Sequence, residues 1–488
     1  MFVVSESLYK KIIQDIGIVT ILGMFTSLSG ILLIPVITKF LGVENYGLYV
    51  QFTVTLALIM GFTTLGLPYA TVRFLAGEKN RQKIRGEVWS SFLIILLTSL
   101  AVSLLIIIFS NSIANSLFGG LSILVIILAV LVPIECISGT FQNLFRVFQK
   151  IKYYSIFNIA KTYVEVILII AVIISGFGII EVALSILITR FIFLLVISAI
   201  MKRLIGLGKP NFSSMKKYLK FGLPTIPSNV ASWINDSSDR YIITILLGIA
   251  AVGYYNPGYS IGSVIGMLSV PFDFVLVSIA AEYYNKGEID LVRNLFKHSL
   301  KYYLLISVPT LLGISILANP ILTIISTPEI AQQSYLVVPI VGMAMVLSGI
   351  GATATGKSLY LAQKNHITMI NWFLVAMINI VLCVLLIPKM GILGAAIATL
   401  ASFSFGFLFG TYFAVKYFDF SVDWTATIKI IVSSLVMALF ILILKPVTLL
   451  DVILAVSASI LVYLVVILAT KTIDKKEINL FISMIKNR

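Results

Sequence analysis

The sequence is built from apolar stretches that are each about as long as a membrane-crossing helix, and this feature limits the fold more than any other. A helix needs roughly 20 mostly apolar residues to cross a bilayer. Fourteen stretches meet this condition, at about 12–38, 46–72, 88–110, 119–143, 154–176, 180–201, 222–247, 253–281, 299–318, 334–355, 367–388, 391–415, 425–444 and 452–470. Only 11% of the 488 residues are Asp, Glu, Lys or Arg, too few to cover soluble domains of this size. We therefore expect an all-α polytopic membrane protein with about 14 transmembrane helices.

The basic residues predict how these helices are oriented. If the N-terminus lies inside, the inner loops and tails hold 28 of the 35 Lys and Arg residues, whereas the outer loops hold three. Such an excess marks the cytoplasmic side. We therefore expect a multi-pass protein of the cytoplasmic membrane with both termini inside. The net charge of +15 then indicates loops beside anionic lipid rather than a nucleic-acid partner.

The two ends of the chain are interpreted in the same way. The stretch 12–38 contains Asp15 and no small-residue cleavage site follows a short apolar run, so we interpret it as a retained helix rather than a signal peptide. At 475–488, apolar residues recur at helical spacing and lysines occupy the other face. This pattern predicts an amphipathic helix on the inner leaflet, with a frayed charged tail as the alternative.

A short motif, Gly-x4-Gly-x-Tyr after a leucine, occurs at 42–49 and again 206 residues later at 248–255. Two other pairs match at offsets of 213 and 214 residues, namely 178–187 with 391–400 and 149–150 with 363–364. Three matches in register indicate two six-helix halves, and the even number of helices makes the halves parallel across the membrane. The motif glycines are expected to allow a tight reversal with positive φ between two spans.

The repeat predicts the domain organisation. We expect an N-terminal six-helix lobe at 1–205, a C-terminal six-helix lobe at 206–420, and two extra transmembrane helices with an interfacial tail at 421–488. Repeated halves are typical of transporters, whose substrate site lies between the halves near the midplane. The basic segment 202–220 is then the linker between the lobes.

Three segments resemble a known family. Residues 39–49 read Lys-Phe-Leu-Gly-Val-Glu-Asn-Tyr-Gly-Leu-Tyr, residues 221–224 read Phe-Gly-Leu-Pro with Asp239 and Arg240 near the end of the same span, and residues 391–396 read Gly-Ile-Leu-Gly-Ala-Ala. They resemble the polysaccharide and oligosaccharide-lipid flippases of the multidrug/oligosaccharidyl-lipid/polysaccharide exporter superfamily. The resemblance implies two V-shaped lobes around a central cavity. It also implies transport, by alternating access, of isoprenoid-diphosphate-linked saccharides from the inner to the outer leaflet, with glycan-assembly enzymes as partners and no cofactor.

Other functions compete with this one. A multidrug and toxin cation antiporter, or a lipid II flippase, would share the architecture, although buried cations disfavour a cationic drug. A membrane-embedded glycosyltransferase should carry a large outer loop with acidic catalytic residues, whereas the longest outer loop here, at 319–333, has about fifteen residues. We therefore expect a transporter rather than an enzyme.

Charged residues inside predicted spans point to the substrate site. They cost about 2.5–3.5 kcal/mol each on insertion scales and are functional candidates by default. Lys161, Arg190 and Arg240 lie at different depths, an arrangement that suits a diphosphate moving between leaflets. We predict that these three bind the substrate, together with Arg73 at the inner mouth and Asn229 on a polar stripe of the seventh span.

Acidic residues within the spans are candidates for binding a coupling proton or cation. They are Asp15, Glu165, Asp236, Asp239 and Asp273. Two of them also offer a structural alternative, because Lys161 with Glu165, and Asp236 with Arg240, lie four residues apart on a helix. Arg190 has no acid nearby in sequence, so we expect it to meet a partner from another helix or a bound anion.

Overall fold

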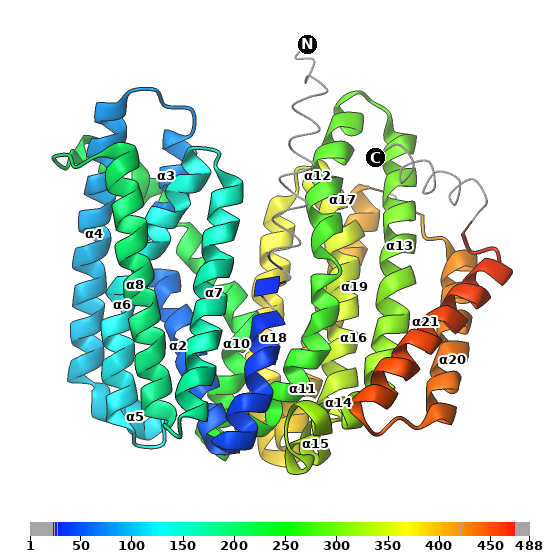
Figure 1. Ribbon diagram of the computed structural model, residues 1–488. Helices are drawn as coiled ribbons and strands as arrows, with labels where there is room; N and C mark the ends of the chain where they lie inside the picture. The colour runs from blue at the N-terminus through cyan, green and yellow to red at the C-terminus, as the bar shows by residue number, and fades with distance from the viewer. Residues whose placement is uncertain (1–22, 24, 27, 419–420, 474–488) are drawn as a thin grey trace. The chain divides into compact units, whose positions relative to one another are not determined.

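The computed structural model describes residues 23, 25–26, 28–418 and 421–473, and its regular elements are helices (Figure 1). The prediction of an all-α protein is confirmed for these residues. The earlier helices are α2 (Val43–Thr63), α3 (Leu67–Leu75), α4 (Arg81–Ile108), α5 (Ser110–Leu117), α6 (Ser122–Val147), α7 (Ile151–Ile174), α8 (Ile179–Ile205), α9 (Met215–Gly222) and α10 (Thr225–Leu247). The later helices are α11 (Ile249–Met267), α12 (Val270–Asn285), α13 (Ile289–Ile316), α14 (Ala318–Ile325), α15 (Pro328–Ser334), α16 (Val337–Ile350), α17 (Gly356–Leu361), α18 (Asn365–Met390), α19 (Ile392–Tyr417), α20 (Trp424–Leu444) and α21 (Leu449–Ala469).

Eleven helices in the described part of the chain are long and apolar enough to cross a membrane. They are α2, α4, α6, α7, α8, α13, α16 continued through α17, α18, α19, α20 and α21. Each of them overlaps one of the predicted spans. The protein is therefore a multi-pass membrane protein, as predicted.

The three remaining predicted spans differ from the simple expectation. The first, at 12–38, lies partly outside the described residues, and its residues 28–38 belong to the short apolar helix Leu28–Phe40. The span at 222–247 is the helix α10, which carries polar side chains along its length. The span at 253–281 is divided between α11 and α12, because the helix is interrupted before Pro271 in the first turn of α12. The total of fourteen spans stays a prediction, as does the amphipathic helix at 475–488, which lies outside the described residues.

By the contacts between helices, the described residues form two compact units. One contains the residues up to Asn256 together with Ala376–Ala395, and the other contains Pro257–Val375 and the residues from Ala396 on. These units are defined by contacts, whereas the predicted lobes at 1–205 and 206–420 are defined by the repeat. The lobe boundaries therefore stay a prediction.

Helix α6 lies at the centre of the first unit. It contacts α2, α3, α4, α5, α7 and α8. Pro133 interrupts its hydrogen-bond ladder because proline has no N–H to donate to the carbonyl of Ala129. The Ser103 hydroxyl on α4 donates to that carbonyl at 2.6 Å, so the break is compensated by a neighbouring helix. The charged residue Glu135 lies two residues after Pro133.

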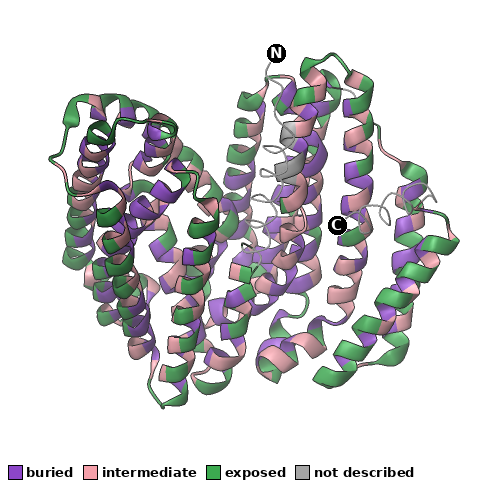
Figure 2. Ribbon diagram, turned by 45° about the horizontal axis from the view of Figure 1, so that its top comes forward, coloured by how far each residue is buried: buried purple, intermediate pink, exposed green. Residues whose placement is uncertain are grey.

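In the second unit, α20 packs against α13 and α21. Much of both C-terminal helices is exposed (Figure 2), and many of the exposed residues are apolar. The exposed apolar residues of these two helices include Leu439, Leu442, Ile443, Ile453, Leu461 and Val465. Such a surface is suited to lipid and would be unfavourable in water.

The two copies of the Gly-x4-Gly-x-Tyr motif pack against each other. Gly42 and Gly248 precede α2 and α11 with φ of 86° and 89°, so the expected positive-φ reversals are confirmed. The second glycine of each motif has a different role. A Cβ on Gly47 would lie 2.3 Å from the carbonyl oxygen of Ile249, and a Cβ on Gly253 would lie 2.1 Å from that of Val43. The contacts are reciprocal, so two α-helices cross here with a local two-fold relation that only glycine permits.

A second repeated pair also has the same backbone structure in both copies. Gln149 and Gln363, 214 residues apart, both have positive φ, at 54° and 58°. The next residue donates its main-chain N–H five residues back in each copy, Lys150 to Phe145 at 2.7 Å and Lys364 to Leu359 at 2.8 Å. Local structure thus supports the repeat at this pair of turns.

The basic segment predicted as a linker is held on the first unit. Its main chain contacts α4, where Asn211 N–H donates to the Gly86 carbonyl at 3.1 Å. Its short helix α9 then buries Tyr218, whose hydroxyl donates to the Glu87 carboxylate, and Ser214 donates to the same carboxylate at 2.8 Å. Burial and the neighbouring Glu87 carboxylate raise the pKa of Tyr218. The segment is therefore a docked element rather than a simple connection.

Candidate functional site

Four charged side chains from three helices form a buried group, which we call the Glu135 cluster: Glu135 on α6, Lys161 and Glu165 on α7, and Arg190 on α8. The Lys161 ammonium lies 2.6 Å from Glu135 Oε1. The Arg190 guanidinium contacts Glu165 at 2.9 Å and 3.2 Å and lies 3.7 Å from Glu135. Every one of these side chains is at most 15% exposed. Two cations therefore balance two carboxylates inside a bundle of apolar helices.

This arrangement differs from the expected partner of Lys161 and supplies the expected partner of Arg190 from another helix. Lys161 does not use its i, i+4 neighbour Glu165 for its close ion pair, since it pairs with Glu135 on another helix. Arg190, which has no acid nearby in sequence, obtains carboxylates from two other helices. Glu135 was missed as a candidate. Its position inside the apolar stretch 119–143 was the available signal, because a carboxylate within a span is a functional candidate by default.

One atom of this cluster stands out. The second carboxylate oxygen of Glu135, Oε2, is buried and has no hydrogen-bond partner among the described residues. A buried ionised oxygen without a donor is costly. Glu135 therefore contacts both cations of the cluster through Oε1.

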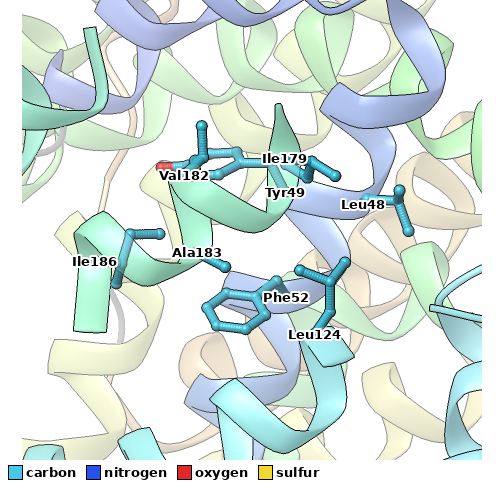
Figure 3. A pocket seen from close by; sticks show the side chains of 8 residues that line it. All are labelled: Leu48, Tyr49, Phe52, Leu124, Ile179, Val182, Ala183 and Ile186. Carbon is cyan, nitrogen blue, oxygen red and sulfur yellow. The ribbon is translucent and has the colours of Figure 1, made fainter. Parts of the chain in front are cut away.

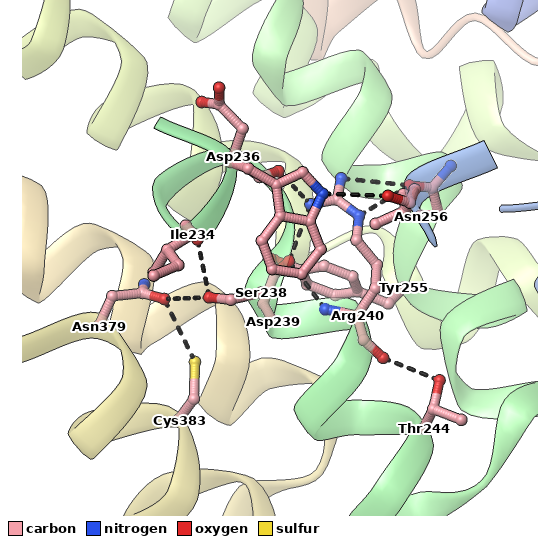
Figure 4. A network of polar contacts seen from close by, with 12 residues as sticks. Ile234, Asp236, Ser238, Asp239, Arg240, Thr244, Tyr255, Asn256, Asn379 and Cys383 are labelled. Atoms are coloured by element: carbon pink, nitrogen blue, oxygen red, sulfur yellow. Dashed lines mark hydrogen bonds and ion pairs between the residues drawn. The ribbon is translucent and has the colours of Figure 1, made fainter. Parts of the chain in front are cut away.

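The second group of buried charges, which we call the Arg240 cluster, consists of Asp239 and Arg240 on α10 with Tyr255 and Asn256 on α11 (Figure 4). Arg240 lies 2.8 Å from the Asp239 carboxylate and donates to Asn256 Oδ1 at 3.2 Å and 3.3 Å. The Tyr255 hydroxyl donates to the other oxygen of Asp239 at 2.6 Å. Asp239 and Arg240 are only 4% and 5% exposed. The cluster thus fixes the start of α11 on α10.

The cluster continues into neighbouring helices. The Asn256 amide donates to the Tyr46 hydroxyl on α2 at 2.8 Å. Ser238, one residue before Asp239, contacts Asn379 on α18 at 3.5 Å, and Cys383 contacts the same amide oxygen at 3.8 Å (Figure 4). Arg240 is therefore part of a polar network rather than an isolated cation.

The remaining candidates on α10 lie on a less buried part of the helix. Arg240 donates to the main-chain carbonyl of Asp236 at 2.6 Å, while the Asp236 side chain is exposed and accepts from Ser232 at 3.4 Å. Asn229 is half-buried. The polar stripe of α10 is thus buried at its Arg240 end and exposed at Asp236.

Three predicted residues remain. Arg73 is exposed in the last turn of α3. Asp15 lies outside the described residues. Asp273 belongs to α12, and its side chain also lies outside the described part. The structure brings Lys161, Glu165 and Arg190 together and places Asp236, Asp239 and Arg240 on one helix.

A small apolar cavity lies beside α8 (Figure 3). Its volume is about 10 Å³, room for about one water molecule. It is lined by Leu48, Tyr49, Phe52, Leu124, Ile179, Val182, Ala183 and Ile186. Without a charged lining residue it offers no place for a diphosphate. No group of three or more His, Cys, Asp or Glu side chains in the described residues could hold a metal ion.

Residues 12–278 match the family described as polysaccharide biosynthesis protein. This chain belongs to that family. It is a family of membrane transport proteins rather than enzymes, so both the resemblance and the expectation of a transporter are confirmed.

One curated relative and two solved structures are similar to this family member. The probable low-salt glycan biosynthesis flippase of Haloferax volcanii is 22% identical over 233 residues, which is 48% of this chain and 49% of that protein. The chain therefore matches about half the length of this relative. A structure titled lipid II flippase MurJ, inward closed conformation, covers 92% of this chain and 97% of its own at 19% identity, with a TM-score of 0.76. An inward-facing multidrug resistance MATE family transporter covers 81% and 95% at 15% identity, with a TM-score of 0.64. These structures establish the fold.

Proposed function

We propose that this protein is a flippase that moves isoprenoid-diphosphate-linked oligosaccharides or polysaccharide repeat units from the inner to the outer leaflet by alternating access. The family match over residues 12–278 carries this proposal, because the matched segment contains both charge clusters. The similarity to a protein described as a probable glycan biosynthesis flippase supports a glycan-bearing substrate. The finer architecture, with fourteen spans and two parallel six-helix lobes around the substrate path, belongs to the same proposal.

In both clusters, a diphosphate could replace a carboxylate as the partner of a buried cation. Arg190 presents its guanidinium to Glu165 through two contacts, and a phosphate accepts the same two-pronged arrangement. Exchange of a carboxylate for a phosphate would keep the cation compensated at each stage. The ion pairs then hold the cations in position until the substrate arrives.

Exchange leaves a carboxylate without its cation, and this suggests how transport is coupled. An orphaned buried carboxylate is strongly unfavourable unless it is protonated. Glu135 already has one oxygen without a hydrogen-bond donor in the described structure. We infer that Glu135 takes up a proton as Lys161 and Arg190 move to the substrate, with Glu165 as the second carboxylate of the exchange.

The Arg240 cluster would act at another stage of the path. Arg240 is held by Asp239 and by Asn256, while the exposed Asp236 and half-buried Asn229 extend along the same helix. Saccharide hydroxyl groups can pair with such carboxylates and amides. In this proposal, Arg240 contacts the diphosphate and the Asn229 region contacts the sugar. Arg73 at the inner end of α3 would gather the substrate.

A cation antiporter is the second candidate. It is favoured by one observation, the exposed carboxylate of Asp236 on the polar stripe of α10, which could attract a cationic drug. The likeness to a multidrug resistance transporter concerns the fold and does not decide between the substrates. Lipid II, with its own isoprenoid diphosphate, would be a substrate within the proposed class.

Reconstitution into proteoliposomes separates these functions. Polyprenyl-diphosphate-linked saccharide is placed in one leaflet, and its appearance in the other is followed with a soluble glycosidase. A fluorescent organic cation is assayed in parallel. We expect protein-dependent movement of the lipid-linked saccharide and no transport of the cation. Movement of the cation alone would replace the flippase with the antiporter.

A further inference from the structure

A cavity of about 320 Å³ lies at the predicted cytoplasmic end of the first unit. Ligand pockets generally begin at about this size. It is formed where the start of α4, the turn between α6 and α7, and the end of α8 meet. Its lining residues are Glu78, Lys79, Arg81, Ile84, Phe148, Lys150, Leu204 and Ile205. None of them belongs to the Glu135 or Arg240 cluster.

The charged part of this lining is predominantly positive. Lys79, Arg81 and Lys150 are exposed, and Glu78 is the single acid. Glu78 already accepts a hydrogen bond from Lys83 at 2.6 Å and from two main-chain N–H groups at 2.9 Å and 3.0 Å. The Lys83 ammonium, followed by these N–H groups, lowers the pKa of Glu78 to about 2. The three lining cations therefore remain available to an anion.

Two helices also begin at this cavity. Arg81 opens α4, and Lys150 immediately precedes α7. Asn80 caps α4 with its side chain, whereas no side chain caps α7. The partial positive charge of a long helix at its N-terminus adds to that of the lysines and arginine. The field at the cavity mouth thus favours a phosphate.

The other part of the lining is apolar. Ile84 and Ile205 are buried, while Phe148 and Leu204 are half-buried. A free anion gains nothing from such a wall. A headgroup phosphate attached to acyl or isoprenoid chains would place its charge beside the cations and its apolar portion against this wall.

The walls are held in place by contacts between helices. The Arg85 guanidinium donates to the carbonyl of Ile205, and the Trp89 indole donates to the Gly206 carbonyl at 3.1 Å. Both contacts fix the end of α8 on α4. The left-handed turn at Gln149 fixes the third wall. The cavity is therefore preformed, which reduces the entropy lost when a ligand binds.

We propose that this cavity binds the phosphate of a lipid headgroup at the inner membrane surface. Basic pockets between helices on the cytoplasmic side are suited to such headgroups. The phosphate can belong to an anionic phospholipid of the bilayer or to a polyprenyl diphosphate. The inference does not depend on the proposed transport activity.

The test is lipid binding by native mass spectrometry on the full-length protein. The probes are phosphatidylglycerol, phosphatidylcholine, polyprenyl diphosphate and inorganic pyrophosphate. The test variant carries Lys79→Gln, Arg81→Gln and Lys150→Gln. The matched control carries Lys209→Gln, Lys216→Gln and Lys220→Gln, exposed residues outside the cavity. Unchanged elution and helical circular dichroism establish that both variants fold.

We expect the cavity variant to bind phosphatidylglycerol or polyprenyl diphosphate about tenfold more weakly or worse, and the control to bind nearly as well as the wild type. The preferred probe identifies the source of the phosphate. Equal weakening in both variants would overturn the proposal in favour of diffuse surface charge. Binding of inorganic pyrophosphate as tight as that of either lipid would overturn it in favour of a soluble anion.

Glu78→Gln should change anion affinity in the opposite direction to the cavity variant. It removes the single lining acid and retains a side chain of similar shape, so anion affinity should rise about two- to fivefold. Lys83, the partner of Glu78, is 48% exposed and can remain solvated in this variant. Affinity that is unchanged or lower would place the phosphate outside this cavity.

Discussion

The Glu135 cluster and the Arg240 cluster solve the same physical problem in different ways. Each keeps an arginine inside a bundle of membrane helices by pairing it with a carboxylate. The Glu135 cluster draws its members from α6, α7 and α8, and its close ion pairs all join different helices. In the Arg240 cluster, by contrast, the carboxylate belongs to the preceding residue, Asp239. One cluster is built by tertiary structure and the other mostly by sequence neighbours.

This difference determines how easily each cation can be released. Arg240 and Asp239 stay close whatever their helices do, because they are adjacent in the chain. Arg190 and Lys161 lose their partners whenever α6, α7 and α8 shift relative to one another. The Glu135 cluster is therefore the better candidate for a switch, and the Arg240 cluster for a contact that holds the diphosphate at a fixed position.

The predicted repeat pairs the cations of both clusters with apolar residues in the other half. The residues 213 positions after Lys161 and Arg190 are Leu374 and Phe403, and the residue 206 positions before Arg240 is Ile34. Phe403 and Ile34 are buried apolar residues. The charges are therefore not duplicated in the predicted repeat.

The largest effect is expected from Arg190→Gln. It leaves Glu135 and Glu165 with Lys161 as the remaining cation of the cluster, and breaking a buried ion pair costs about 3–5 kcal/mol. We expect a marked fall in thermal stability in detergent and loss of most glycan export. The double variant Arg190→Gln with Glu165→Gln restores the charge balance and should regain stability but not export. Wild-type stability in the single variant would contradict the conclusion that ion pairs between helices stabilise the protein at this cluster.

Glu135→Gln tests the switch itself. The amide mimics a protonated carboxyl group and cannot change its charge. We expect transport in proteoliposomes to lose its dependence on a pH gradient, whereas Asp239→Asn keeps that dependence. Stability should fall by about 1–3 kcal/mol, because Lys161 loses its charged partner. A pH response that persists in Glu135→Gln at full strength would exclude this residue as the coupling site.

Arg240→Gln should destabilise the protein less than Arg190→Gln. Asp239 would still accept hydrogen bonds from the Tyr255 hydroxyl and from the main-chain N–H of Arg240, so its charge would remain partly compensated. We expect a loss of about 2 kcal/mol, measured by the same thermal unfolding assay. A larger loss than that of Arg190→Gln would reverse the ranking of the two clusters.

The smallest effect is expected from Tyr255→Phe in the Arg240 cluster. Tyr255→Phe removes the 2.6 Å hydrogen bond to Asp239 and leaves the ring in place. A hydrogen bond to a charged group contributes about 1.5–3 kcal/mol, so the fall in stability should lie at the lower end of this range and export should continue. Loss of export at normal stability would mean that Tyr255 contacts the substrate.

The sequence predicts features that depend on residues close together in the chain. The apolar stretches give the membrane helices, and the positive φ at Gly42 and Gly248 follows from the short connections. The reciprocal packing of Gly47 and Gly253 could not be predicted, because no local rule tells that the two motifs meet. They lie 206 residues apart and become neighbours only in the folded chain.

The same limit applies to the candidate site. The spacing of Lys161 and Glu165 favours an i, i+4 pair, yet Lys161 pairs with Glu135, 26 residues earlier. That pairing depends on how α6 and α7 are rotated about their axes, which is set by apolar packing over the whole unit. For Arg240 the same spacing favours Asp236, whereas its close ion pair is with the adjacent Asp239.

The most direct test of the proposed mechanism is glycan export by the double variant Arg190→Gln with Arg240→Gln, measured in cells that lack the native protein and corrected for protein abundance. Glutamine retains hydrogen bonding and removes the charge. Lys429→Gln serves as the control, because Lys429 lies near the predicted inner end of its helix. We predict that the double variant accumulates to a lower level and fails to export glycan even after this correction, whereas the control exports normally. Normal export per molecule of the double variant would contradict the claim that these cations carry the diphosphate across the membrane.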